Sequence, residues 1–114
     1  NKGVTNMMDA FRDMYDVVTD RRANPQEGSY TCYLFEKGID KILKKCGEEC
    51  TEMVIAAKNK DNDELANEIN DLLYHMIVMM AERGVTVDDI EKIMVERSRK
   101  IGNLKQFHVS DHNT

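Results

Sequence analysis

Two pairs of acidic residues in this chain could share a metal ion. In each pair the acids are three residues apart, which puts both carboxylates on one face of a helix: Glu49 with Glu52, and Glu68 with Asp71. A polar break near Lys60 separates the pairs. If two helices fold back antiparallel there, Glu52 comes opposite Glu68 at the same height, and both opposed pairs lie about 12–17 Å from the turn. Glu49 then faces Asp71, and one hairpin gathers four carboxylates.

Four carboxylates at close quarters repel one another, and Mg²⁺, which prefers oxygen ligands, would relieve that repulsion. A metal held in this way can activate a water molecule and polarise a phosphoryl oxygen. Lys41 and Lys45 precede Glu49 on the same helical face. Lysine before glutamate is the less favourable order for a helix pair, so helix stabilisation explains these lysines poorly. Lysines that lead into a metal patch suit a polyphosphate substrate.

Other interpretations of these residues stay open at this point. The acids could form an ordinary solvated face. However, the helical face that carries Glu68 and Asp71 continues through His75 to Val78, into apolar sequence. We expect His75 to lie in the core or to support a ligand, because hard cations prefer oxygen. Glu48 points about 100° away from Glu49 on a helix, so the general base cannot be assigned from spacing. The chain has no phosphate-binding glycine loop, no recognisable nucleophile motif and no Glu-x-x-His pair of a di-iron bundle.

Apolar periodicity predicts an all-α fold, an antiparallel arrangement of four to five helices. The expected helices cover about 6–22, 31–37, 39–59, 61–83 and 86–102, with a loop at 23–30 that holds the only proline. These elements form one domain, 1–102. Residues 103–114 show no clear period and are predicted to be a tail of unassigned role.

The segment 72–81 is apolar on nearly every side, so it should be buried all round. Few helices are available to surround it in a small chain, which predicts a homo-oligomer.

The net charge of −5 argues against binding to nucleic acid or anionic membrane, and no apolar run is long enough to span a bilayer. Three cysteines without a C-x-x-C pair favour a reducing cytoplasm, and we expect Cys46 and Cys50 to be small buried hydrophobes.

Longer motifs surround the acids. The sequence contains Arg21-Arg22-x-Asn24-Pro25-x-x-Gly28-Ser29-Tyr30-Thr31, then Leu34-Phe35-x-Lys37-Gly38-x-x-Lys41-Ile42-x-Lys44-Lys45-x-Gly47-Glu48-Glu49, and later Asp71-Leu72-Leu73-Tyr74-His75. The two acid pairs resemble the ExxE…ExxD signature of the all-α nucleoside-triphosphate pyrophosphohydrolase (MazG-like) superfamily. With the longer motifs, roughly residues 8–97 resemble the phosphoribosyl-ATP pyrophosphohydrolase family.

This resemblance implies Mg²⁺-dependent hydrolysis of 1-(5-phosphoribosyl)-ATP to the corresponding AMP and pyrophosphate, the second step of histidine biosynthesis. It implies metal binding by Glu49, Glu52, Glu68 and Asp71, with Glu48 and Glu49 as catalytic residues. Phosphates would contact Lys37, Lys41 and Lys45, and the nucleotide site would be shaped by Gly28, Ser29, Tyr30 and Thr31. The family forms dimers through its helices and also occurs fused to a cyclohydrolase, and we expect the stand-alone form here.

Two alternatives remain. A sister enzyme that hydrolyses noncanonical or excess (d)NTPs could use the same four acids, although the 28–38 segment speaks against it. A helical metal-binding or interaction module without turnover would bind Mg²⁺ and consume no substrate.

Overall fold

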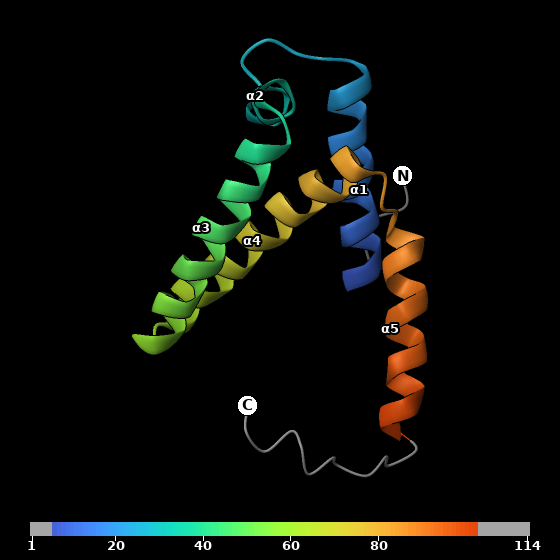
Figure 1. Cartoon of the computed structure of the whole chain (residues 1–114). Coiled ribbons are helices and arrows are strands. Elements are labelled where there is room, and N and C mark those ends of the chain that lie inside the picture. The colour runs from blue at the N-terminus through green and yellow to red at the C-terminus, as the bar shows by residue number, and fades with distance from the viewer. Residues whose placement is uncertain (1–5, 103–114) are drawn as a thin grey trace.

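The computed structural model describes residues 6–102, which form five helices joined by short loops (Figure 1). The helices are α1 (Met7–Ala23), α2 (Tyr30–Lys37), α3 (Ile39–Lys58), α4 (Asn62–Arg83) and α5 (Val87–Gly102). No strand occurs within the described residues, so the all-α prediction is confirmed. The tail predicted at 103–114 lies outside them.

Side-chain caps fix where the two C-terminal helices begin. The Asp61 carboxylate accepts a hydrogen bond from the Glu64 backbone N–H at 3.0 Å, as the sequence predicts for the start of α4. Gly84 ends that helix in the left-handed conformation, with φ of 80°. Thr86 and Asp89 then cap α5 reciprocally, at 2.9 and 3.1 Å. Because α4 carries two of the candidate ligands, its fixed start sets the height at which they face α3.

Helices α3 and α4 form a long antiparallel hairpin, the most extensive helix pairing in the described chain (Figure 1). The chain reverses between Asn59 and Asp61, where Lys60 adopts a φ of 60°. This confirms the predicted reversal near residue 60. Helix α1 packs against α4 as well, and α2 packs on α1, α3 and α4. The hairpin that should gather the acids is therefore anchored at its open end by α1 and α2.

The core lies at that open end. Its fully buried side chains come from four helices: Val18, Leu34, Ile42 and Val78. Half-buried aromatic side chains such as Phe11 and Phe35 pack against it. The predicted burial of segment 72–81 holds for five positions, namely His75, Ile77, Val78, Met80 and Ala81. Met76 remains 37% exposed in the single chain.

Several predicted apolar positions face outward. Cys50 is exposed, so its prediction as a buried hydrophobe is wrong, whereas Cys46 is half-buried. On α3 the buried positions are Ile42, Glu49 and Ala56, so an acid occupies the seam where Cys50 was expected. Helix α5 packs only on α1 among the described helices, and its Ile93 and Met94 are exposed.

Within residues 6–102 no helix is both long and apolar enough to cross a membrane.

Candidate active site

Three of the four predicted metal ligands converge where α3 faces α4. Glu49 comes from α3, and Glu68 and Asp71 come from successive turns of α4. One carboxylate oxygen from each lies within 4.8 Å of the others. Glu49 is only 8% exposed, although it is charged. The arrangement follows from two local features: the i, i+3 spacing on α4, and an antiparallel hairpin that brings the middle of α3 to the same height.

Two oxygen atoms in this cluster are buried without a hydrogen-bond partner among the described residues, Glu49 Oε1 and Glu68 Oε1. A buried carboxylate oxygen without a donor is costly, and native structures rarely leave one so. A divalent cation would satisfy both oxygens at once. The donor set is entirely carboxylate oxygen, which suits Mg²⁺ rather than a softer metal. The residues present therefore fit a hard divalent cation.

The electrostatics of the cluster also favour a bound cation. A hydrogen bond with Glu64 raises the pKa of Glu68 to about 7, and burial together with the negative charges of Glu52, Glu64 and Asp71 adds to the shift. Glu52, the fourth predicted ligand, is exposed and lies outside the group of three. Its charge nevertheless acts on Glu68, so it lies beside the cluster. The described structure supplies more negative charge here than its cations neutralise.

Lys45 is the one predicted phosphate-binding lysine that reaches these acids in the described structure. Its Nζ lies 3.3 Å from Glu48 Oε1 and 3.7 Å from Glu49 Oε2. A hydrogen bond to Glu48 is the main cause that raises the Lys45 pKa, so its ammonium stays charged. Lys41 is half-buried one turn earlier on α3, while Lys37 ends α2 with its Nζ 5.8 Å from the centre of the Tyr33 ring.

The segment Gly28–Thr31 lies against α4, next to the cluster. Gly28 has a φ of 83°, and Ser29 caps α2 by accepting a hydrogen bond from the Cys32 backbone N–H. The Tyr30 hydroxyl lies 3.0 Å from His75 Nε2, and the Thr31 hydroxyl is hydrogen-bonded to that of Tyr74. A hollow of about 500 Å³ is lined by residues of this segment and by neighbours between Gln26 and Glu36. The predicted nucleotide segment and the predicted metal ligands are therefore neighbours.

Sequence reasoning missed three contributors to this region. Glu64 lies one turn before Glu68, and like charges at i, i+4 could have signalled their interaction. Tyr33 and Tyr74 flank Tyr30, with ring centres 6.0 and 6.2 Å away. The i, i+3 spacing of Tyr30 and Tyr33 on α2 could have indicated their contact. Nothing in the sequence predicts that Tyr74 meets Tyr30, because it comes from α4.

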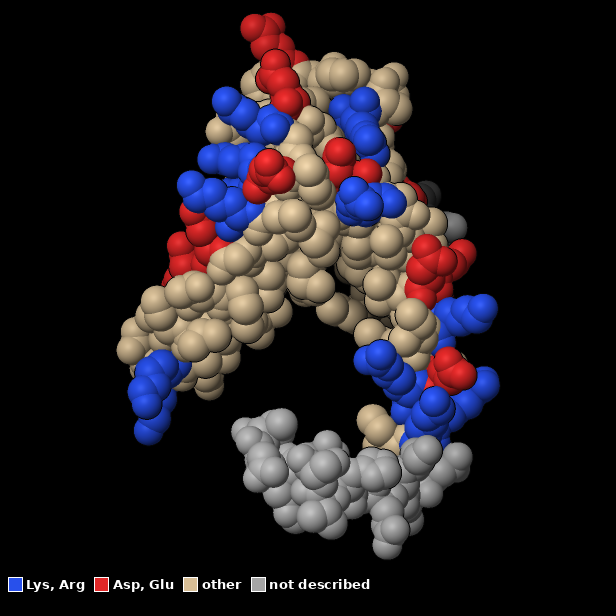
Figure 2. Space-filling view, viewed as in Figure 1, with Lys and Arg blue, Asp and Glu red and all other residues tan. Residues whose placement is uncertain are grey.

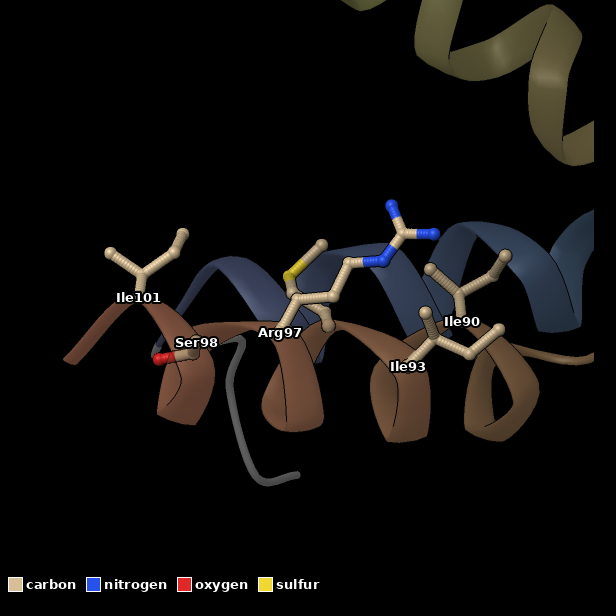
Figure 3. Close-up of a pocket in the computed structure, with 6 residues that line it drawn as sticks. Ile90, Ile93, Arg97, Ser98 and Ile101 are labelled. Atoms are coloured by element: carbon tan, nitrogen blue, oxygen red, sulfur yellow. The ribbon is translucent and has the colours of Figure 1, made fainter. Parts of the chain in front are cut away.

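A hollow of similar size lies elsewhere, on α5. It has a volume of about 520 Å³ and is lined by Ile90, Ile93, Met94, Arg97, Ser98 and Ile101 (Figure 3). Figure 3 shows their side chains along one side of α5, and the lining holds no carboxylate. It therefore offers apolar contact but lacks groups for metal or acid–base chemistry. The acid cluster between α3 and α4 is the better candidate for an active site.

Comparison with known proteins identifies the family to which the chain belongs. The family described as phosphoribosyl-ATP pyrophosphohydrolase matches residues 11–98. A phosphoribosyl-ATP pyrophosphatase of Clostridium novyi is 51% identical over 98 residues, which are 86% of this chain and 89% of that protein. Another phosphoribosyl-ATP pyrophosphatase, from Streptococcus thermophilus, is 55% identical over 91 residues, 80% of this chain and 88% of that protein.

A longer relative matches as well. The histidine biosynthesis bifunctional protein HisIE of Thermoanaerobacter pseudethanolicus is 58% identical over 80 residues, which are 70% of this chain and 37% of that protein. The family match covers the loop at 23–30, both acid pairs and all of α2, α3 and α4. The resemblance predicted from the motifs is thus confirmed, and the chain belongs to the phosphoribosyl-ATP pyrophosphohydrolase family of hydrolases.

Proposed function

We propose that this protein hydrolyses 1-(5-phosphoribosyl)-ATP to 1-(5-phosphoribosyl)-AMP and pyrophosphate, the second step of histidine biosynthesis. Family membership supports this substrate. The observation that carries the proposal is the convergence of Glu49, Glu68 and Asp71, with two buried oxygens that lack partners. In the reaction the α–β anhydride bond breaks, water supplies the oxygen of the new P–O bond, and pyrophosphate leaves.

Mg²⁺ is the proposed cofactor, held by Glu49, Glu68 and Asp71, with Glu52 as the fourth proposed ligand. When bound, it would polarise phosphoryl oxygens and lower the pKa of a coordinated water. The support is the donor set, which is all oxygen, and the excess of negative charge around Glu68. With Lys45 as the cation beside them, the four carboxylates would otherwise oppose the close approach of α3 and α4.

The residues around the cluster have separate tasks in this proposal. The Lys45 ammonium, held between Glu48 and Glu49, would contact the phosphates as negative charge builds on the leaving pyrophosphate. Lys37 and Lys41 would extend that contact along α2 and α3. Glu48 is half-exposed and paired with Lys45, so it can accept a proton from the attacking water, while Glu49 would bind the metal. Gly28, Ser29, Tyr30 and Thr31 would bind the nucleoside.

We also propose that two copies assemble into a homodimer in the cytoplasm. Exposed apolar side chains support the dimer: Val54 and Ile55 on α3 are 58% and 53% exposed, and Ile93 and Met94 on α5 are 49% and 59% exposed. Figure 2 shows that the face of the hairpin turned to the viewer carries few charged side chains below its upper end. Apolar surface of this extent is typical of an interface. Cys32, Cys46 and Cys50 are free thiols, which suits a reducing compartment.

A substrate panel tests the proposed activity. Pyrophosphate release would be measured from phosphoribosyl-ATP and, side by side, from ATP and the four dNTPs, each with Mg²⁺. We expect release from phosphoribosyl-ATP alone. Release from dNTPs alone would mean that the chain acts as the sister enzyme on excess or noncanonical nucleotides. Binding of Mg²⁺ without turnover of any substrate would reduce the cluster to a structural metal site.

A further inference from the structure

His75 connects the predicted metal ligands to the predicted nucleotide segment. Its ring is buried, only 6% exposed. Nδ1 lies 2.8 Å from the Asp71 backbone oxygen, and Nε2 lies 3.0 Å from the Tyr30 hydroxyl. A carbonyl oxygen can only accept a hydrogen bond, so Nδ1 carries the proton. In the neutral ring Nε2 is then the acceptor, and the Tyr30 hydroxyl donates to it.

This arrangement ties the first turn of α2 to α4 one turn beyond Asp71. The Tyr30 ring meets the His75 ring edge-on, with centres 5.7 Å apart, and stacks on Tyr74. The hydrogen bond between Thr31 and Tyr74 adds a second link between the same two helices. Tyr30 could rotate or withdraw only by giving up its bond to His75, whose own position is fixed by the Asp71 carbonyl.

The Tyr30 ring is held in place and yet accessible. It is 44% exposed, and Tyr33, which stacks on it, is 39% exposed. Both line the hollow of about 500 Å³ beside the loop. On its other side the phenol lies near the α3 charges: burial raises the Tyr30 pKa, while the positive charge of Lys45 opposes that shift and Glu49 adds to it. Tyr30 therefore lies between the phosphate-binding residues and an open aromatic surface.

We infer, resting on the proposed function, that His75 is a positioning residue that presents Tyr30 to the purine of the substrate. The Nδ1–H tautomer, anchored on the Asp71 carbonyl, holds the Tyr30 hydroxyl, and the exposed part of the ring is left to contact the base. A flat π-surface is suited to stacking on a nucleobase. Tyr33 extends the same surface. This assigns the nucleoside end of the substrate to the Tyr30–Tyr33 side and the triphosphate end to the Lys45–Glu49 side.

Steady-state kinetics of four variants test the link. Tyr30→Phe keeps the ring and loses the hydroxyl, and His75→Asn keeps an amide donor for the Asp71 carbonyl but loses the acceptor for Tyr30. Each should raise KM for phosphoribosyl-ATP about five- to tenfold, with kcat within about twofold. The double variant should lose no more than either single one, because both remove the same hydrogen bond. His75→Gln, which can place an acceptor near the Nε2 position, should recover most of the KM.

Two further measurements separate this role from simple stability. Tyr15→Phe removes a hydroxyl from a half-buried tyrosine of α1, away from the site, and should leave KM unchanged. Nitrogen-15 NMR of the histidine ring should find His75 as the Nδ1–H tautomer, whether or not the enzyme turns over. An Nε2–H tautomer, or losses that multiply to about 25- to 100-fold in the double variant, would overturn the inference. A wild type without turnover would instead overturn the proposed function, and the NMR result would still stand.

Discussion

Glu49 on α3 and Glu68 on α4 face each other across the hairpin, and each buries one oxygen that has no hydrogen-bond partner in the described structure. Glu49 is paired with Lys45 on its own helix, but two carboxylates brought together between the helices repel each other and weaken the packing of α3 against α4. The hairpin is therefore destabilised at this point, and a divalent cation bound there would restore its stability. This relationship generates the first two predictions.

The stability of the metal-free protein should depend on Glu68. Its pKa is about 7 in the folded chain and lies near 4.5 in the absence of the fold. Between these values the folded state holds a proton that the unfolded state has lost, so the free energy of unfolding falls as pH rises from about 4.5 to 7. Thermal melts in chelator at pH 5, 6, 7 and 8 should show this fall, and Glu68→Gln should flatten it. An equal fall in Glu68→Gln would contradict this assignment.

Removal of a proposed metal ligand should sharply reduce activity without unfolding the protein. Glu49→Gln and Asp71→Asn should each lower kcat/KM by at least about a hundredfold, because the metal loses a charged ligand. The melting temperature in chelator should stay equal or rise, since a repulsion is relieved. Glu96→Gln, an exposed carboxylate of α5, is the matched control and should change neither quantity. A large loss of melting temperature in Glu49→Gln would indicate a structural role instead.

Adjacent lysines on α3 offer a matched pair. Lys45 contacts Glu48 and Glu49, whereas Lys44 is exposed on a neighbouring face of the helix. We expect Lys45→Met to reduce kcat/KM roughly 10- to 100-fold through the loss of a charge beside the phosphates. Lys44→Met should have little effect, although it removes the same charge from the net total. Steady-state kinetics at two salt concentrations measure both effects. Equal losses of kcat/KM in both variants would mean that only the overall electrostatic field of the protein matters.

Sequence alone could predict the architecture and the position of the acids, for reasons visible in particular residues. Asp61, Gly84 and the Thr86–Asp89 pair mark helix ends by local chemistry, and a turn near Lys60 brings three of the four acids together, with Glu52 outside the group. It could not predict that Glu49 lies in the buried seam of α3 while Cys50 is exposed, because hydrophobicity places them the other way round. The hydrogen bond between Tyr30 and His75 joins residues far apart in the chain, and no local sequence pattern encodes such a contact.

Helix α5 should carry part of the dimer interface. Met94 lines the apolar hollow of Figure 3 and is 59% exposed in the single chain. Met94→Glu would place a charge in the interface, so we expect it to shift the protein from dimer to monomer at micromolar concentration. Val95 is also exposed but lines a different hollow with Asp88 and Lys92, and Val95→Glu is the control. Light scattering after size exclusion measures the mass, and a monomeric wild type would refute the dimer.

The central claim is that the carboxylates between α3 and α4 form the metal-dependent site of pyrophosphate release. The most direct test is the release of pyrophosphate from phosphoribosyl-ATP by the wild type and by Glu49→Gln, as Mg²⁺ is titrated from zero in chelator-treated protein. We predict no release without metal, one pyrophosphate per substrate once Mg²⁺ is added, and release at least about a hundredfold slower from Glu49→Gln at every tested concentration. Release that persists in chelator, or that is undiminished in Glu49→Gln, would contradict the claim.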